Sequence, residues 1–232
     1  SELEGLVKRG VRYIEIIDDL FTVDTQRVQQ ICQAIIDRQF DIDAWCYGKV
    51  GRVDYKTLLL MKKAGFSWIA YGFESGNELI GSQSNKRQSY KDIKEVVRIT
   101  HDAGLNIMAN WMFGLPGDSF ASMGDTLELA NLISSDFACF YSTMAFPGTA
   151  LYQELLAKGE GYRLPDCWEG YQQYSYYTKP IGTEYLSPKD VLEFRDKAFI
   201  SYISSDQFRD NTKMKFGSRG EDYLNRILNR PR

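Results

Sequence analysis

The sequence predicts an α/β fold with parallel strands, on three observations. Short apolar runs typical of buried strands alternate with stretches of helical periodicity, in units of about 30 residues. Polar residues follow the ends of several of these runs, where parallel α/β folds bind ligands. The 232 residues are 44% hydrophobic, enough for one large domain or a domain with a small extension. The spacing leaves a barrel and a doubly wound sheet open, although the first strand is not followed by Gly-x-Gly-x-x-Gly.

Each element has a local reason in the sequence. The strands are expected at residues 11–17, 42–47, 67–73, 105–113 and 137–144. The helices between them are expected from residue 24 or 25, at 54–64, at 89–103 and from 119. Asp24 or Thr25 caps the first of these helices, while Gly65 and Gly104 end the second and third. The alternation implies right-handed crossovers between parallel strands.

The character of the sequence changes after residue 160. Residues 161–185 are rich in tyrosine and show little periodicity, and we expect these rings to pack rather than to form a stacking platform. Pro188 in the first turn favours a helix after Ser187, and the polar tail has one short helical signal at 223–228. We therefore predict a partial barrel over 1–160 and a Tyr-rich, helical extension over 161–232 that covers one end of the sheet.

Composition and charge exclude several classes. The net charge of −3 argues against nucleic-acid binding as the main function. No run reaches the roughly 18 apolar residues that a membrane span needs. The cysteines at 32, 46, 139 and 167 are scattered, which suits a reducing cytoplasm better than a disulfide scaffold. The opening residues 2–9 read as the middle of a helix, so we expect a further segment upstream.

The strand ends carry the candidate site. Asp18 and Asp19 follow the first strand and could hold a metal, accept a hydrogen bond from an ammonium group or cap the next helix. Lys49 follows the second strand, where a lone lysine is weak evidence. Glu74 comes directly after the apolar run 67–73, and Asn110 lies near the end of the fourth strand.

Two turns follow the last two strands. The segment 114–118, Gly-Leu-Pro-Gly-Asp, brings bare backbone close to whatever lies above the sheet and could read the edge of a flat heterocycle. The alternative is a stiff turn capped by Asp118 or Ser119. The turn 147–149 has the same ambiguity. His101 is the only histidine and lies on a helix away from the strand ends, which disfavours a Ser-His-Asp triad or a histidine-ligated zinc.

Taken in order, four segments resemble the radical S-adenosylmethionine (radical SAM) superfamily, in the branch that often has an upstream cobalamin-binding domain. They are Ile-Asp-Asp-Leu-Phe-Thr at 17–22, Gly-Phe-Glu-Ser-Gly at 72–76, Phe-Gly-Leu-Pro-Gly-Asp at 113–118 and Phe-Pro-Gly-Thr at 146–149. Each segment alone is weak, whereas the ordered set, which covers about residues 1–160, is specific.

The resemblance implies a partial (β/α)6 TIM-like barrel that binds S-adenosylmethionine (SAM). The acidic turn at Asp18 and Asp19 would receive the amino group of SAM, Glu74 and Ser75 would contact its ribose or methionine end, and the 114–117 turn would line the adenine. The full set of expected cofactor-binding residues is Asp18, Asp19, Phe21, Lys49, Glu74, Ser75, Asn110, Phe113, Gly114, Leu115, Pro116 and Met144.

The chain departs from the family at the first barrel strand and its Cys-x3-Cys-x2-Cys loop, which are absent. Those thiolates would hold a [4Fe–4S] cluster with one iron open for SAM. We therefore expect the chain to be the C-terminal part of a radical SAM domain, inactive by itself. The intact enzyme would cleave SAM reductively and act on a small-molecule substrate, with cobalamin-dependent methylation as one outcome.

Two alternatives stay open at this point. One is a barrel without a cluster that binds a small ligand or serves in assembly, and the other is a metal-dependent enzyme that holds Mg²⁺ or Mn²⁺ with Asp18, Asp19 and Glu74. The missing strand would also leave the strand at 11–17 as an unpaired edge. We expect the C-terminal segment, a partner chain or a second copy in a homo-oligomer to cover that edge.

Overall fold

One sheet organises the fold. The structure, a computed structural model, describes residues 2–83, 88–160 and 163–229. Its strands run in the order of the sequence: β1 (Tyr13–Ile16), β2 (Asp43–Gly48), β3 (Phe66–Glu74), β4 (Asn106–Phe113) and β5 (Phe137–Ser142). The registers place Tyr13 opposite Asp43 and Gly48 opposite Tyr71 in parallel pairs. A sequential order is typical of barrels, whereas a doubly wound sheet reverses at a switch point. The predicted α/β class with parallel strands is confirmed.

The chain divides into two compact units, which we describe one at a time. Unit 1 consists of residues 1–73, 88–110 and 135–137. Unit 2 consists of residues 74–87, 111–134 and 138–232. The division passes through β4 after Asn110 and through β5 after Phe137. This division differs from the domain boundary that the sequence predicted at residue 160. That boundary stays a prediction.

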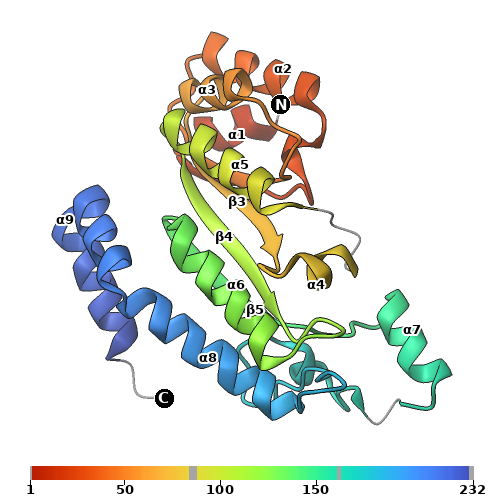
Figure 1. Cartoon of the computed structure of the whole chain (residues 1–232). Helices are drawn as coiled ribbons and strands as arrows, with labels where there is room; N and C mark the ends of the chain where they lie inside the picture. The colour runs from red at the N-terminus through yellow and green to blue at the C-terminus, as the bar shows by residue number, and fades with distance from the viewer. Residues whose placement is uncertain (1, 84–87, 161–162, 230–232) are drawn as a thin grey trace. The chain divides into compact units, whose positions relative to one another are not determined.

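In unit 1, helices cover the buried face of the strands (Figure 1). They are α1 (Glu2–Lys8), α2 (Thr25–Asp37), α3 (Tyr55–Lys63) and α5 (Tyr90–Asp102). Asp24 caps α2 by accepting from the backbone N–H of Arg27 at 3.0 Å, as the sequence predicted. The α2 and α3 helices pack against each other, and their buried side chains include Val28, Cys32 and Leu58.

Two polar contacts hold α5 to the strands of unit 1. The hydroxyl groups of Tyr71 and Thr100 lie 3.1 Å apart in the core. Asp136 lies 2.8 Å from His101 Nε2 and also accepts from the backbone N–H of Ile107 at 2.8 Å. His101 therefore links α5 to Asp136, which directly precedes β5. This contact gives the histidine a structural role.

Unit 2 is mainly helical. It contains α4 (Glu78–Gln83), α6 (Phe120–Ile133), α7 (Ala150–Ala157), α8 (Pro188–Ser204) and α9 (Asp206–Leu228). Figure 1 shows α8 beside α6 and leading into α9. A capping box between Ser187 and Asp190 starts α8, with Pro188 in its first turn. Among the described residues, none of the helices is both long and apolar enough to cross a membrane.

The helical signal predicted at 223–228 lies in a helix but underestimates its length, because α9 runs from Asp206 to Leu228 with a kink at Gly217. The helix is polar around most of its circumference, so its sequence lacks the apolar stripe that periodicity detects. Gly217 has a positive φ of 63° and interrupts the helical pattern further. Phe208 packs on Tyr202 of α8 with ring centroids 4.8 Å apart, so tertiary contacts supply the stability that the sequence signal did not show.

The prediction that the Tyr-rich segment packs was wrong for several of its rings. Tyr174 is 74% exposed and Tyr176 is fully exposed. The segment is nevertheless held in place at several points. Gln173 is one of them, because its side chain accepts from the backbone N–H of Ser142 at 2.9 Å and donates to the carbonyl of Ser142 at 2.8 Å. The Gln173 side chain thus pairs with the backbone of Ser142, the last residue of β5, as a neighbouring strand would. Lys179 is another, because its ammonium group donates to the carbonyl of Leu164 at 2.8 Å.

Two adjacent leucines of α3 test which face of the helix packs into the core. Leu58 is 0% exposed and Leu59 is 36% exposed. Leu58→Ala should lower the free energy of unfolding by about 2–5 kcal/mol, because it leaves a cavity in the core. Leu59→Ala should change it by less than about 1 kcal/mol. Urea denaturation of the two variants checks this, and equal losses would contradict the assigned face.

Candidate functional site

The end of β1, in unit 1, is acidic, as predicted. Asp18 forms an ion pair with Arg27 of α2, with 2.6 Å between Oδ2 and the guanidinium nitrogen. Asp19 is exposed and has no partner among the described residues. Asp24, rather than either of them, caps α2. Of the two candidates, Asp19 is therefore the carboxylate that an incoming ammonium group can reach without first breaking an ion pair.

Lys49 and Phe21 lie close together in unit 1 for a structural reason. The backbone N–H of Lys49 donates to the hydroxyl of Thr22 at 2.9 Å, which ties the end of β2 to the turn after β1. The Phe21 ring is 1% exposed and stacks on Phe66 with centroids 5.5 Å apart. Phe21 is thus a core residue that fixes this turn, and a ligand contact through its ring would need the core to open.

Glu74, the first residue of unit 2, ends β3 in an unusual backbone conformation. Its φ is +65°, in the left-handed region that costs a non-glycine residue free energy. The next residues are held against α6. The N–H of Gly76 donates to the hydroxyl of Thr126 at 2.9 Å, and a Cβ on Gly76 would come within 2.7 Å of the backbone of that helix. Backbone strain such as that of Glu74 persists only where the surrounding structure imposes it, and it is typical of ligand sites.

Ser75 is less accessible than the resemblance implies. It is 8% exposed, and its hydroxyl lies 3.3 Å from the hydroxyl of Thr126 while accepting from the N–H of Asn77 at 3.1 Å. These bonds shape the turn after β3. Met144, another predicted contact, is 7% exposed in the segment that follows β5 in unit 2.

The turn at 114–118 is built around the buried carboxylate of Asp118. Asp118 is 1% exposed. One oxygen accepts from the N–H of Leu115 at 2.9 Å and the other from the Ser122 hydroxyl at 2.6 Å, while the N–H of Gly114 also donates to this carboxylate. Burial raises the pKa of the Asp118 carboxyl, and these hydrogen bonds oppose the rise.

This network answers the question that the sequence left open. Asp118 stiffens the turn from within, while Ser119 caps α6. The N–H groups of Gly114 and Leu115 face Asp118, so a backbone contact of the turn with a heterocycle would use its other N–H and C=O groups. A ligand would also meet the apolar surface of the turn, where Pro116 is exposed and Leu115 is 8% exposed.

The extension holds the same turn from its outer side, within unit 2. The hydroxyl of Thr183 donates to the carbonyl of Asp118 at 2.8 Å. Gly114 has a φ of +75°, and a Cβ there would come within 2.8 Å of Val191 on α8. Phe113 is fully buried, with its ring stacked on Phe140 and in edge contact with Phe194 of α8. Residues after 160 therefore shape the turn directly.

Asn110 ends the part of β4 that belongs to unit 1. The burial of β4 alternates, and Asn110 shares its half-buried face with Asn106 and Met108. Its Oδ1 is shielded from solvent and has no hydrogen-bond partner among the residues that the structure describes. A buried acceptor without a donor costs about 1–3 kcal/mol, so this atom is suited to accept a hydrogen bond from a ligand.

The predicted residues are divided between the units. Unit 1 holds Asp18, Asp19, Phe21, Lys49 and Asn110; unit 2 holds Glu74, Ser75, Met144 and the 113–116 segment. Sequence reasoning missed Thr126, Thr183 and Val191, which shape the turns. Thr183 and Val191 are far along the chain from the residues that they hold, and no local pattern marks them.

The cysteines do not form a cluster site. Cys32 and Cys46 are buried, and burial raises the pKa of Cys32 to about 12 and that of Cys46 further. Cys139 is half-buried and Cys167 is exposed. Within the described part of the chain, no three His, Cys, Asp or Glu side chains gather as a metal site requires. This does not support the metal-dependent alternative built on Asp18, Asp19 and Glu74.

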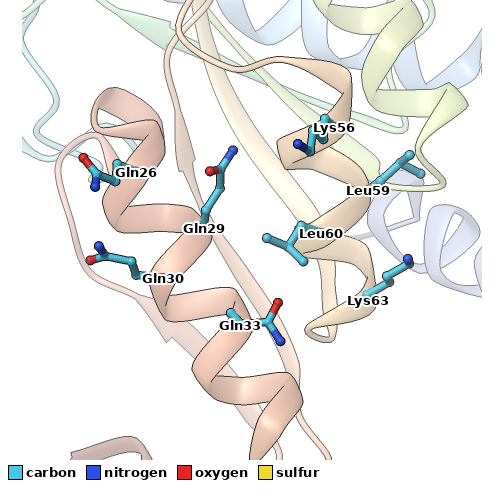
Figure 2. Close-up of a pocket in the computed structure, with 8 residues that line it drawn as sticks. All are labelled: Gln26, Gln29, Gln30, Gln33, Lys56, Leu59, Leu60 and Lys63. Carbon is cyan, nitrogen blue, oxygen red and sulfur yellow. The ribbon is translucent and has the colours of Figure 1, made fainter.

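A groove of about 570 Å³ lies elsewhere in unit 1, between α2 and α3. Figure 2 shows glutamines of α2 on one side and lysines and leucines of α3 on the other. Gln29 donates to the hydroxyl of Thr57 across it at 2.9 Å. None of the predicted site residues lines this groove, so it is separate from the strand ends.

Comparison with known proteins decides the family. The model of the radical SAM superfamily matches residues 2–130, more than half of the chain. The chain belongs to the radical SAM superfamily. The match includes three of the four segments that carried the resemblance, while the fourth, at 146–149, lies beyond it.

The relatives include methyltransferases and cyclases. An uncharacterized methyltransferase of Pyrococcus horikoshii is 24% identical over 197 residues, which cover 83% of this chain and 41% of the relative. An anaerobic magnesium-protoporphyrin IX monomethyl ester cyclase of Rubrivivax gelatinosus is 23% identical over 214 residues, 87% of this chain and 37% of the cyclase. The chain thus spans less than half the length of these relatives.

Solved structures agree on the fold. The radical SAM methyltransferase TsrM from Kitasatospora setae, solved with cobalamin and a [4Fe–4S] cluster, has a TM-score of 0.64 at 18% identity, over 70% of this chain and 31% of TsrM. The cobalamin-dependent radical SAM enzyme OxsB, with aqua-cobalamin and SAM bound, has a TM-score of 0.52 at 15% identity, over 79% of this chain and 27% of OxsB.

Two carboxylates of unit 2 provide a matched test of the turn. Asp118→Ala should lower the free energy of unfolding by about 1–3 kcal/mol, because it leaves buried N–H and O–H donors without an acceptor. Asp125→Ala should cost less than about 1 kcal/mol, because Asp125 is exposed and bonds only the Asn77 side chain at 2.8 Å. Urea denaturation measures both. A loss for Asp118→Ala no larger than that for Asp125→Ala would show that the carboxylate does not hold the turn.

Proposed function

We propose that this chain is the SAM-binding part of a radical SAM enzyme whose whole form modifies a small molecule, with methyl transfer as the favoured reaction. One observation carries the proposal: the family match spans consecutive parallel strands whose polar ends are the residues that the resemblance assigns to SAM. In such enzymes SAM supplies a methyl group or, after reductive cleavage, a 5′-deoxyadenosyl radical. The residues of this chain would bind and orient it.

The residues present fit the polar groups of SAM. The exposed carboxylate of Asp19 offers an acceptor for the amino group. The unpaired Oδ1 of Asn110 offers one for a donor of the nucleoside. The turn at 114–118, held by Asp118, offers the exposed apolar ring of Pro116 to the adenine. A preorganised surface of this kind binds without a further ordering cost.

The residues do not fit a [4Fe–4S] cluster. Cys32 and Cys46 are core thiols, and the four cysteines lack the Cys-x3-Cys-x2-Cys spacing. We therefore assign no step of the reaction to a cluster bound by these 232 residues. The whole enzyme would need cluster ligands from a part of the protein outside them.

Cobalamin and the cellular location belong to the same proposal. OxsB is a cobalamin-dependent enzyme and TsrM has been solved with cobalamin bound. TsrM has also been solved with its tryptophan substrate and a SAM analogue, at a TM-score of 0.63. These likenesses support a cobalamin-binding domain elsewhere in the protein and a small-molecule substrate. Free, scattered cysteines support the cytoplasm.

Binding of SAM to this chain tests the proposal directly. Asn110→Leu should raise the Kd for SAM about tenfold, because one buried hydrogen bond is lost. Asn106→Leu is the matched control on the same face of β4 and should leave the Kd within about twofold. Isothermal titration calorimetry measures all three proteins. Absence of SAM binding by the unaltered chain would overturn the proposal in favour of a binding or assembly module for another ligand.

Anaerobic reconstitution with iron and sulfide tests whether the cysteines of this chain can hold a [4Fe–4S] cluster. The chain should show no stoichiometric [4Fe–4S] absorbance and no cleavage of SAM by dithionite, because its thiols are buried or isolated. A radical SAM protein that carries the three-cysteine loop is the positive control. A stoichiometric cluster together with SAM cleavage would show that the cysteines have been wrongly excluded.

A further inference from the structure

A second unpaired amide oxygen lies in unit 1, on a residue that sequence reasoning did not select. The Oε1 atom of Gln88 is shielded from solvent and has no hydrogen-bond partner within the described parts of the chain. Gln88 belongs to the connection between β3 and α5, and such connections carry the ligand contacts of parallel α/β folds.

The orientation of this amide is fixed by its neighbour. Gln88 Nε2 donates to the backbone carbonyl of Gly72 in β3 at 3.1 Å. A flip of the amide would place two carbonyl oxygens against each other, so the nitrogen must face Gly72 and the oxygen must face away. The absence of a donor at Oε1 therefore does not arise from an exchange of oxygen and nitrogen.

The backbone next to Gln88 is also held in place. Ser89 caps α5, with its hydroxyl accepting from the N–H of Asp92 at 3.2 Å and its N–H donating to the Asp92 carboxylate at 3.0 Å. The capping box thus fixes the residue next to Gln88, and β3 holds the Gln88 side chain. The acceptor is preorganised, which lowers the cost of binding a donor.

We propose that Gln88 is a ligand-binding residue whose Oε1 accepts a hydrogen bond from a nucleoside donor of SAM, either a ribose hydroxyl or the adenine amino group. The inference rests on the proposed function and adds a residue to it. Two buried oxygens, on Gln88 and Asn110, then serve the same chemistry. Native proteins leave few buried polar atoms unpaired, and those that remain need a reason.

Gln88→Met tests the assignment, because methionine has a similar length and lacks the amide. The Kd for SAM should rise about fivefold to tenfold. Thr212→Val is the matched control: Thr212 Oγ1 of α9 is also buried without a partner among the described residues. Its neighbour Asn211 donates to the hydroxyl of Ser134, which precedes β5 instead of following a strand. This control should leave the Kd within about twofold, and urea denaturation should show that both variants fold.

Analogues of SAM that lack the ribose hydroxyls or the 6-amino group distinguish the two donors. The analogue that lacks the donor to Gln88 should bind the unaltered chain more weakly than SAM does. It should bind the Gln88→Met variant as tightly as SAM does. If the unaltered chain binds SAM and Gln88→Met binds it equally well, the inference is overturned while the proposed function stands. The same holds if every analogue loses equal affinity in both proteins. If the unaltered chain does not bind SAM, both fail.

Discussion

The buried carboxylate of Asp118 is the constraint on which the 114–118 turn depends. A charged or protonated carboxyl at 1% exposure is tolerable only because Ser122 and the N–H groups of Gly114 and Leu115 donate to it. The same bonds leave the turn a single conformation. Thr183 and Val191 then complete its outer side, so residues after 160 belong structurally to the turn rather than merely following it.

Each unit has unfavourable local features at the ends of its strands. In unit 2, Glu74 has a positive φ, and Gly76 lies too close to α6 for any larger residue. In unit 1, Asn110 and Gln88 each hold an unpaired acceptor. Natural sequences are otherwise locally consistent, and exceptions gather at functional sites. Other described residues share these features, such as Thr212 with its unpaired Oγ1 and Ser134 with its positive φ, so the features support a ligand site at the strand ends only together with the family match.

Much of the fold was predictable from the sequence, because buried parallel strands and capped helices have local signals. The strand 67–73 and the cap at Asp24 were found from residues within a few positions of one another. The polar helix α9 was mostly missed because its stability comes from contacts such as Phe208 with Tyr202 rather than from an apolar stripe. Of the site, the sequence indicated Asp19, Glu74 and Asn110. It could not indicate Gln88, because the property that matters is an unpaired oxygen, and pairing depends on Gly72 in three dimensions.

The chain therefore separates two requirements of radical SAM chemistry. Recognition of SAM needs acceptors and an apolar surface held in fixed positions, and turns anchored by Asp118 and the capping box at Ser89 provide such positions. Activation of SAM needs a cluster with an open iron, and buried thiols such as Cys32, with a pKa of about 12, are unsuited to hold one. In the proposed function, these residues would contribute hydrogen bonds and packing to SAM recognition, and the open iron of a cluster held outside them would contribute a further contact. SAM affinity is consequently the property of this chain through which its place in the family can be judged.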